Sequence, residues 1–306
     1  MTASPPQYDE SDQRPGSPLP GGVHLDSTAH MMNRISSQLA SQLSFVRLDG
    51  RRRPGPPALV VVAHGSRDPR ALSTVRALLD RVRALRPGLP VHLGHIELNE
   101  PLLSDTLAHL DTAGTSDAVL VPLLLSRGYH VKRDIPETAA AARVRTRVAA
   151  PLGPHPLLVD ALHARLTEAG WRDPRTEDER RTSAVVLAAA GSRDPDSAVD
   201  TGRTARLLSA RLGVPVVPAY ATTSAPTVPE AIQALTARGR HRVAVASCFT
   251  APGRFATESA AAAPWLVSAP LGTHESMAHL ILHRYDRARA TSPVPTPQPS
   301  IVTACA

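Results

Sequence analysis

Short aliphatic runs alternate with segments of helical periodicity through most of the chain. The first run, 58–63, is followed by apolar residues spaced as on one helical face over 70–85, until Pro87-Gly88 ends the pattern. Fully apolar strands that alternate with helices indicate a parallel sheet covered on both faces. The pattern predicts further strands at 90–98, 118–125 and 146–152, and helices at 101–110, at 135–145 and up to about residue 170.

The same pattern begins again after residue 183. The pentad GSRDP at 65–69 recurs unchanged at 191–195, and PLGPH at 151–155 returns as PLGTH at 270–274. The order of strands and helices between these landmarks is also the same. The sequence therefore predicts two tandem α/β domains with parallel sheets, produced by internal duplication.

This repeat divides the chain into parts of different character. The N-terminal residues are rich in proline, serine and arginine without periodicity, which is typical of a disordered segment. The expected parts are a disordered N-terminal extension at 1–56, a first domain at 57–170, a charged linker at 171–183, a second domain at 184–288 and a flexible tail at 289–306.

The bulk composition excludes several classes of function. The net charge is +7, but arginines spread along the chain supply nearly all of the positive charge, and aromatic residues for base stacking make up only 3%. We therefore expect no nucleic-acid partner, although an anionic small molecule suits the charge. Two unpaired cysteines, Cys248 and Cys305, no membrane-length apolar run and no signal-peptide core predict a cytoplasmic protein without a membrane partner.

Three polar side chains lie at the ends of the first three predicted strands of the first domain. His64 follows the first strand, Glu97 lies at the end of the second, and His130 follows the third. The carboxyl ends of parallel strands share one edge of the sheet, where α/β proteins bind their ligands. A single histidine after a strand is more often a structural residue than a ligand, so each signal is weak alone.

The duplicate lacks all three of these side chains. Ala190 occupies the position of His64, Thr222 that of Glu97, and Phe255 that of His130, whereas the glycine and proline landmarks are retained. Simultaneous loss of two imidazoles and a carboxylate indicates that the three residues act as one set. Together they suit a borderline divalent ion, and with only three protein ligands the ion would stay exchangeable or reactive.

Other candidates flank this set. Arg127, Lys132 and Arg133 lie beside the histidines and could pair with carboxylates of a substrate. Arg67 recurs in the duplicate as Arg193, which favours a structural role. His155 and His274 occur in both copies and are interpreted as structural turn residues, while His95 is a further, weaker candidate for the site.

Four motifs of the first domain resemble those of the sirohydrochlorin chelatases, the ATP-independent class II chelatases of siroheme and cobalamin biosynthesis. The matching segments cover VVAHGSRDP (61–69), HIELNEP (95–101), PLLLSRGYHVKRDIP (122–136) and PLGPHP (151–156). The resemblance implies flavodoxin-like folds in two copies and a lyase-type enzyme that inserts Co²⁺ or Fe²⁺ into sirohydrochlorin, with no cofactor beyond that substrate metal. By matching position, His64 and His130 would bind the metal and Glu97 would be the acidic residue of the site.

The resemblance also sets the expected substrate contacts and the alternatives. The carboxylate-rich tetrapyrrole would dock through Arg127, Lys132 and Arg133 and through second-domain arginines such as Arg254, in the crevice between the domains. A non-catalytic metal or tetrapyrrole carrier on the same fold is the alternative, and a metal-dependent hydrolase is a further one. The choice between iron and cobalt is not readable from His and Glu ligands. The duplication suggests a monomer whose halves replace a homodimer.

Overall fold

The computed structural model describes residues 55–222 and 224–291. Within them, two four-stranded parallel sheets follow one another along the chain. This confirms the expected duplicated, flavodoxin-like α/β architecture. We refer to residues 57–170 as the first half and to residues 184–288 as the second half. These boundaries follow the sequence repeat, and as domain boundaries they remain a prediction.

The first half contains four strands and the helices that follow them. The apolar runs at Ala58–Ala63 and Asp117–Pro122 form buried strands. The helix that begins at Pro69 is capped by Asp68, which accepts a hydrogen bond from the Arg70 amide. In chain order the elements are β1 (Ala58–Ala63), α2 (Pro69–Leu85), β2 (Val91–His95), α3 (Leu103–Thr112), β3 (Asp117–Pro122), the π-helical turn η1 (His130–Asp134), α4 (Ile135–Ala141), β4 (Arg145–Val148) and α5 (Pro156–Glu168).

The second half repeats this order. It is preceded by a short helix within the expected linker, which begins with a capping box between Thr176 and Glu179. The elements are α6 (Glu177–Thr182), β5 (Ser183–Ala189), α7 (Pro195–Leu212), β6 (Val216–Tyr220), α8 (Val228–Thr236), β7 (Arg242–Ser247), α9 (Arg254–Ala261), β8 (Leu266–Val267) and α10 (Glu275–Ala290).

Both sheets have the same strand order. The first is β2-β1-β3-β4 and the second is β6-β5-β7-β8, with every pair parallel. In each sheet the chain leaves the central strand, β1 or β5, toward one neighbour and returns to the other. This reversal is the topological switch point, outside which open α/β sheets form their binding crevices.

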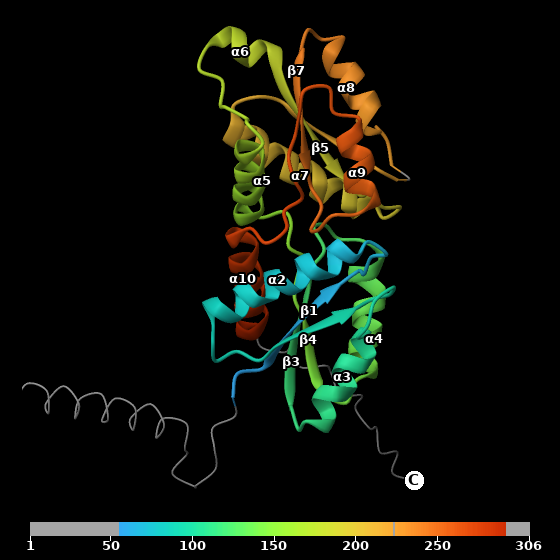
Figure 1. Ribbon diagram of the computed structural model, residues 1–306. Coiled ribbons are helices and arrows are strands. Elements are labelled where there is room, and N and C mark those ends of the chain that lie inside the picture. The colour runs from blue at the N-terminus through green and yellow to red at the C-terminus, as the bar shows by residue number, and fades with distance from the viewer. Residues whose placement is uncertain (1–54, 223, 292–306) are drawn as a thin grey trace, which may run out of the picture. The chain divides into compact units, whose positions relative to one another are not determined.

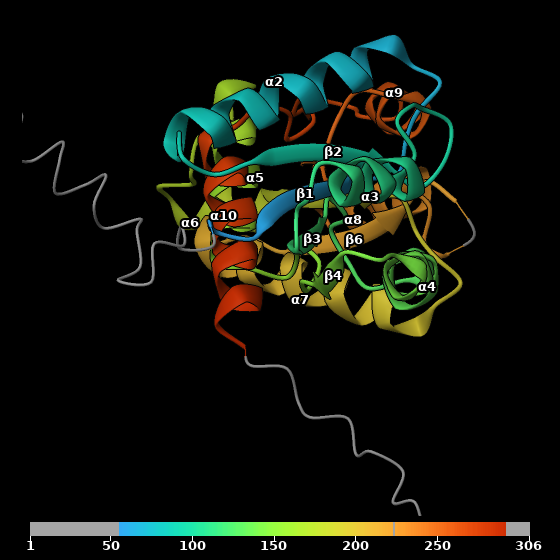
Figure 2. The same ribbon diagram turned by 90° about the horizontal axis from the view of Figure 1, so that it is seen from below.

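Side chains of the central strands alternate between two cores. In β1, Leu59, Val61 and Ala63 join a core with α2, while Ala58, Val60 and Val62 join a separate core with α3 and α4. Figure 2 shows α2 and α3 on opposite sides of the first sheet. The α2 core is continuous with the corresponding core of the second half, so the two halves share one hydrophobic interior. A cut between the halves would therefore expose a large apolar area.

The last helix of each half packs on the other half. Helix α5, from the first half, packs against α7 and β7, whereas α10, from the second half, packs against α2 and β3 (Figure 1). The fully buried Tyr285 of α10 donates a hydrogen bond of 2.7 Å to the Pro57 carbonyl just before β1. The two halves therefore exchange their C-terminal helices.

Two equivalent arginines form hydrogen bonds between each exchanged helix and the half on which it packs. Arg165 of α5 donates from Nε and Nη2 to the Leu271 carbonyl at 3.1 and 2.9 Å, and Arg284 of α10 donates from Nη2 to the Leu152 carbonyl at 3.0 Å. Each arginine lies ten positions after the histidine that caps its helix. His155 and His274 accept hydrogen bonds from the Leu157 and Ser276 amides, as expected for structural turn residues.

Several elements depart from the predicted bounds. The helix predicted at 135–145 ends at Ala141, and the strand predicted at 146–152 forms at Arg145–Val148. The strand predicted at 118–125 ends at Pro122, and the helix predicted from residue 135 is preceded by the π-helical turn η1. The strand predicted at 90–98 ends at His95. Both of these strands end earlier than their apolar pattern indicates, because the residues that follow them form the turns at the sheet edge.

Some expectations concern residues outside the described ranges. These are the extension at 1–54, Cys305 and most of the tail at 289–306, of which only 289–291 are described, with α10 ending at Ala290. In residues 55–222 and 224–291, no helix is both long and apolar enough to cross a membrane.

Candidate active site

The switch point of the first sheet brings two histidines together. His64 follows β1 directly, and His130 begins η1 after β3, the strand that pairs with β1. Their ring centroids are 4.7 Å apart with the rings nearly perpendicular. Two residues separated by 66 positions in the sequence thus meet because their strands are neighbours.

A tight turn at Gly65 places Glu97 beside His64. The His64 carbonyl accepts a hydrogen bond of 3.0 Å from the Glu97 amide, and the Ser66 amide donates to Asn99 Oδ1 at 2.7 Å. Gly65 has φ +102°, and a Cβ there would lie 1.9 Å from the Glu97 carbonyl oxygen. Only glycine permits this close approach of the two loops.

The His64 ring is oriented by its own loop. Its Nδ1 lies 3.3 Å from the Gly65 carbonyl oxygen, which can only accept, so a hydrogen bond between them requires the tautomer with the proton on Nδ1. Its Nε2 lies 3.5 Å from Glu97 Oε1. Both of these atoms are electron-pair donors in that state, and a proton or a metal cation between them would neutralise their repulsion.

The His130 ring has an equivalent arrangement with a stronger partner. Its Nδ1 is 2.5 Å from Oδ2 of Asp134, one helical turn later in η1. A carboxylate on Nδ1 fixes the tautomer and leaves Nε2 as the free lone pair, as in metal-binding histidines. Asp134 was absent from the sequence prediction, although the spacing of four residues is a usable signal once η1 is known to be helical.

The three predicted ligands lie at one sheet edge without forming a closed cage. Among residues 55–222 and 224–291, no three His, Cys, Asp or Glu side chains converge as a ready metal site. His95, the weaker candidate, is only 2% exposed, and its Nδ1 lies 3.1 Å from the Pro101 carbonyl oxygen. Burial lowers the pKa of His95, which keeps the ring neutral.

A cleft of about 1010 Å³ opens beside the two histidines. Its walls come from both halves and include His64, His130 and Tyr129 of the first half and Phe249 and Phe255 of the second half. Cys248 also lines the cleft, but burial raises the pKa of its thiol to about 12, so it stays protonated. The cleft is wide enough for a ligand of several hundred cubic ångströms and offers it aromatic and aliphatic surface.

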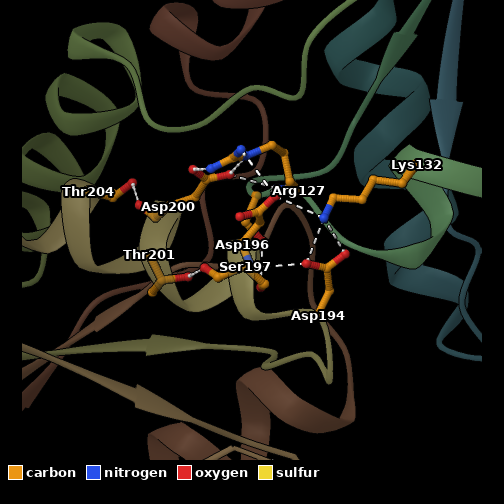
Figure 3. Close-up of polar contacts among 9 residues, drawn as sticks. Arg127, Lys132, Asp194, Asp196, Ser197, Asp200, Thr201 and Thr204 are labelled. Atoms are coloured by element: carbon orange, nitrogen blue, oxygen red, sulfur yellow. Dashed lines mark hydrogen bonds and ion pairs between the residues drawn. The ribbon is translucent and has the colours of Figure 1, made fainter.

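Two of the predicted substrate-binding cations are engaged by carboxylates of the second half (Figure 3). Arg127 pairs with Asp200 and Asp196, and Lys132 pairs with Asp194 and Asp196. Hydrogen bonds that Lys132 donates to Asp194 and Asp196 raise the pKa of Lys132, and the hydrogen bond to Asp200 above all raises that of Arg127. Binding of a substrate by these two residues stays a prediction, and it would have to compete with these ion pairs.

The other two predicted cations face different surroundings. Arg254 lines the cleft, is exposed, and lies over the Phe255 ring with its guanidinium carbon 4.7 Å from the ring centroid. Its Nε is 3.7 Å from Glu258. Arg133 is exposed next to the His130 turn and is not among the cleft-lining residues. Arg254 is therefore the better placed of the two for a ligand in the cleft.

Two exposed apolar side chains border the histidines and were missed in the sequence. Leu98 is 50% exposed with a positive φ of 67°, and Tyr129 is 63% exposed. A leucine held in the left-handed region at a cleft indicates a functional constraint on its loop. No sequence pattern marks Leu98, because only its backbone conformation is unusual.

The second half preserves the scaffold of the site without its chemistry. Gly191 repeats the positive φ of Gly65, and the Ala221 amide bonds to the Ala189 carbonyl just as Ile96 bonds to Ala63. In place of the Glu97 carboxylate, the Thr222 hydroxyl donates to the Ala190 carbonyl at 2.6 Å. At this position of the second half, the side chain therefore bonds to its own half's backbone instead of presenting a carboxylate.

The fold and this cleft define a duplicated α/β protein with a candidate site at the switch point of its first sheet. The CbiX family model matches residues 58–169 and 184–288, more than half of the chain, and the chain therefore belongs to the CbiX family. The two matched segments coincide with the two halves of the sequence repeat.

Known proteins similar to this chain carry related names. The sirohydrochlorin ferrochelatase of Bacillus subtilis is 31% identical over 185 residues, covering 58% of this chain and 68% of that protein. The sirohydrochlorin cobaltochelatase of Methanococcus maripaludis is 35% identical over 80 residues, covering 26% of this chain, and the chain spans 56% of that relative. The solved structure of SirB from Bacillus subtilis with Fe³⁺ is 24% identical, with 77% of this chain and 96% of that chain covered and a TM-score of 0.64. This last likeness concerns the fold.

Proposed function

We infer that this protein is a metal chelatase that inserts Fe²⁺ or Co²⁺ into sirohydrochlorin. The observation that carries this inference is the pair of histidines, His64 and His130, presented to a large cleft by a chain of the CbiX family. Relatives named as sirohydrochlorin ferrochelatase and cobaltochelatase support the substrate. In enzyme classification this reaction is that of a lyase.

His64 and His130 would receive the substrate metal through their Nε2 atoms, with Glu97 as the anionic ligand. Both Nδ1 atoms face acceptors, and Glu97 lies 3.5 Å from His64 Nε2. Imidazole and carboxylate ligands accept both Fe²⁺ and Co²⁺, so the site chemistry is compatible with either metal. Three protein ligands leave further coordination positions open for transfer to another set of nitrogens.

The tetrapyrrole would enter the cleft beside the histidines. The aromatic surface of Phe249 and Phe255 suits the flat faces of the macrocycle, and Arg254 at the cleft is available to its carboxylates. Metal insertion replaces two pyrrole N–H protons by one M²⁺ ion, so two protons must leave. Glu97 and the histidines are the nearest groups that could accept them.

The test of this function is metal insertion measured anaerobically. Purified protein, sirohydrochlorin and either Fe²⁺ or Co²⁺ are mixed, and the absorbance change of the tetrapyrrole is followed against a blank without protein. We expect acceleration over the blank, lost in His64→Ala and His130→Ala and retained in His109→Ala, whose side chain is exposed on α3 away from the cleft. The faster metal would decide between the siroheme and cobalamin routes.

The alternative is a carrier that binds metal or tetrapyrrole without turnover. It requires the same ligands, so binding alone does not distinguish the two. A wild-type insertion rate equal to the blank, with sirohydrochlorin still bound, would establish the carrier and reject the enzyme.

We further propose that the protein acts as a monomer in the cytoplasm. The exchanged helices and the shared core within one chain support a monomer, because each half already covers the other. Sedimentation equilibrium across a range of concentrations tests this, and a mass of twice the chain would contradict it.

A further inference from the structure

The segment that carries His130 is fastened on both sides to the second half. Three residues before His130, the Arg127 amide donates to Asp200 Oδ2 at 2.9 Å, and the guanidinium adds bonds from Nε at 2.9 Å and Nη2 at 2.8 Å. Two residues after His130, Lys132 Nζ lies 2.7 Å from Asp194 Oδ2 and 2.9 Å from Asp196 Oδ2. Figure 3 shows both cations pointing at the start of α7.

We call these five residues, Arg127, Lys132, Asp194, Asp196 and Asp200, the ion-pair cluster. Asp200 is only 2% exposed, and its two oxygens accept three hydrogen bonds from Arg127 alone. A buried carboxylate with bonds to both the backbone and the side chain of one residue fixes that residue's position more firmly than a surface ion pair does. The cluster therefore restrains the backbone leading into η1.

The cluster is not reproduced at the symmetric place in the molecule. The second-half positions corresponding to Arg127 and Lys132 are Pro252 and Thr257, which carry no charge. Opposite them, the α2 positions corresponding to Asp196, Ser197 and Asp200 are Arg70, Ala71 and Thr74. Where the cluster uses Asp194 to bind Lys132, the first half uses Asp68 to bind its own Arg70 at 2.7 Å.

This asymmetry coincides with that of the ligands. The half that lost its histidines presents the acidic residues, and the half that kept them presents the basic residues beside His130. Lys132 is also the only lysine in the chain, at a position where its compact charge reaches two carboxylates at once.

We propose that Asp194, Asp196 and Asp200 of the second half are positioning residues for His130, acting through Arg127 and Lys132. The proposal rests on the proposed function, because it takes His130 as a ligand of the substrate metal. It gives the second half a defined task, which is to hold the metal-receiving turn of the first half at the cleft. Metal sites lose affinity or activity when the residues that hold their ligands in position are removed.

The role differs from substrate binding by Arg127 and Lys132 in one decisive respect. Among the described residues, those lining the cleft do not include Asp194, Asp196 or Asp200. A loss of metal affinity on removing the charge of Asp200 would therefore act through the His130 segment rather than through a lost substrate contact.

The test compares Asp200→Asn with a matched control, Asp286→Asn. Asp286 accepts two hydrogen bonds from Arg86, at 2.7 and 2.8 Å, in another ion pair that joins α2 to the exchanged α10. Neither Arg86 nor Asp286 lines the cleft. Amide hydrogen exchange of residues 126–134 is measured by mass spectrometry, and Co²⁺ binding is titrated by absorbance without tetrapyrrole.

In Asp200→Asn we expect the amide exchange of residues 126–134 to become about tenfold faster and the Co²⁺ dissociation constant to rise about tenfold. In Asp286→Asn both quantities should stay near their wild-type values. In insertion assays of Asp200→Asn, kcat falls while KM for the tetrapyrrole is retained. Lys132→Met gives the same pattern at an exposed position where folding is not at risk, and Lys132→Arg restores it.

Unchanged exchange and unchanged Co²⁺ affinity in both Asp200→Asn and Lys132→Met would overturn the proposal. Equal loosening of residues 126–134 in Asp286→Asn would overturn it as well, because the effect would then belong to the exchange of helices in general. Wild-type protein that binds no Co²⁺ would instead overturn the proposed function, and the exchange rates would still decide whether the cluster holds the segment.

Discussion

The two halves of this molecule have nearly the same scaffold but different side chains at the switch points of their sheets: imidazoles in the first half and apolar groups in the second. In the first half His64 directly follows β1 and His130 begins η1, whereas the second half has Ala190 and Phe255 at these positions. Glycine turns, strand order and capping histidines are common to both. The comparison shows that the turns, the strand order and the core of a repeat can be kept while a few side chains at the ends of its strands change.

The largest effect is expected from transplanting the ligands. Ala190→His, Thr222→Glu and Phe255→His are introduced together into a chain that lacks His64 and His130. We expect the insertion rate to remain about a hundredfold or more below wild type, because the second half has no counterpart of the ion-pair cluster to hold its new histidine. Anaerobic insertion assays on folded protein measure this. Recovery to near the wild-type rate would mean that the ligands alone suffice.

A second comparison concerns the equivalent glycine turns. In Gly65→Ala the new Cβ would lie 1.9 Å from the Glu97 carbonyl oxygen, whereas in Gly191→Ala the nearest atom is the Thr222 hydroxyl at 3.0 Å. We expect the free energy of unfolding to fall by about 3 kcal/mol or more in the first variant and by about 1–2 kcal/mol in the second. Urea denaturation measures both changes.

Gly114→Ala supplies the reference for this pair. Gly114 also has a positive φ, but no atom lies within 4 Å of its added Cβ, so its cost reflects backbone strain alone. Equal losses in all three variants would show that the contact between the Gly65 turn and Glu97 contributes nothing beyond that strain.

The exchanged helices offer a third comparison. Arg165 makes two hydrogen bonds to the Leu271 carbonyl, while Arg284 makes one to the Leu152 carbonyl and keeps a buried Nε without a partner among the described residues. Arg165→Met should lower the free energy of unfolding by about 1–2 kcal/mol, and Arg284→Met by less than about 1 kcal/mol, because removal of the unpaired Nε offsets the lost bond. The reverse order in thermal or urea unfolding would contradict this.

The smallest effect is a pH dependence of stability from Asp200. Burial alone would raise the pKa of Asp200, but hydrogen bonds and charge from Arg127 outweigh it and lower the pKa below the ordinary 3.8. The unfolded chain therefore binds a proton at higher pH than the folded one. This contribution to stability is complete above about pH 5 and is lost as the pH falls through 3.8 and below.

Unfolding curves between pH 6 and pH 3 check this sign. Asp200→Asn should show a shallower loss of stability on acidification than wild type does. A steeper loss in the variant would mean that Asp200 does not carry a lowered pKa in the folded protein.

Much of the fold followed from the sequence because aliphatic runs and the repeated pentad are local signals. The strand order also followed, since helices between successive strands allow few topologies. The exchange of α5 and α10 could not be predicted. Each helix has a buried apolar face, with residues such as Leu162 of α5 or Ile281 of α10. An apolar face of this kind could cover either sheet, so the sequence does not show which one it covers.

The positions of the candidate residues could be predicted as far as neighbouring strand ends determine them, whereas their role as a site stays a prediction. His64 and Glu97 meet because β1 and β2 are adjacent, and His130 joins them through β3. The pairing of Arg127 with Asp196 and Asp200 joins residues 69 and 73 positions apart in different repeats, and no periodicity connects them. In the sequence, Asp194-Pro195-Asp196 indicates only the start of a helix. The ion pairs of Asp194 and Asp196 with Lys132 depend on how the two halves pack, which the sequence does not show.

The exchange of helices has a consequence for synthesis of the chain. The part of the first sheet that packs on α10, beside the part covered by α2, stays uncovered until residues 275–290 have been made, although the last strand of that sheet ends at Val148. At about 5–20 residues per second, a ribosome takes on the order of ten seconds to cover that interval. The first half is therefore synthesised before the second half, but its core is completed only when the second half supplies α10.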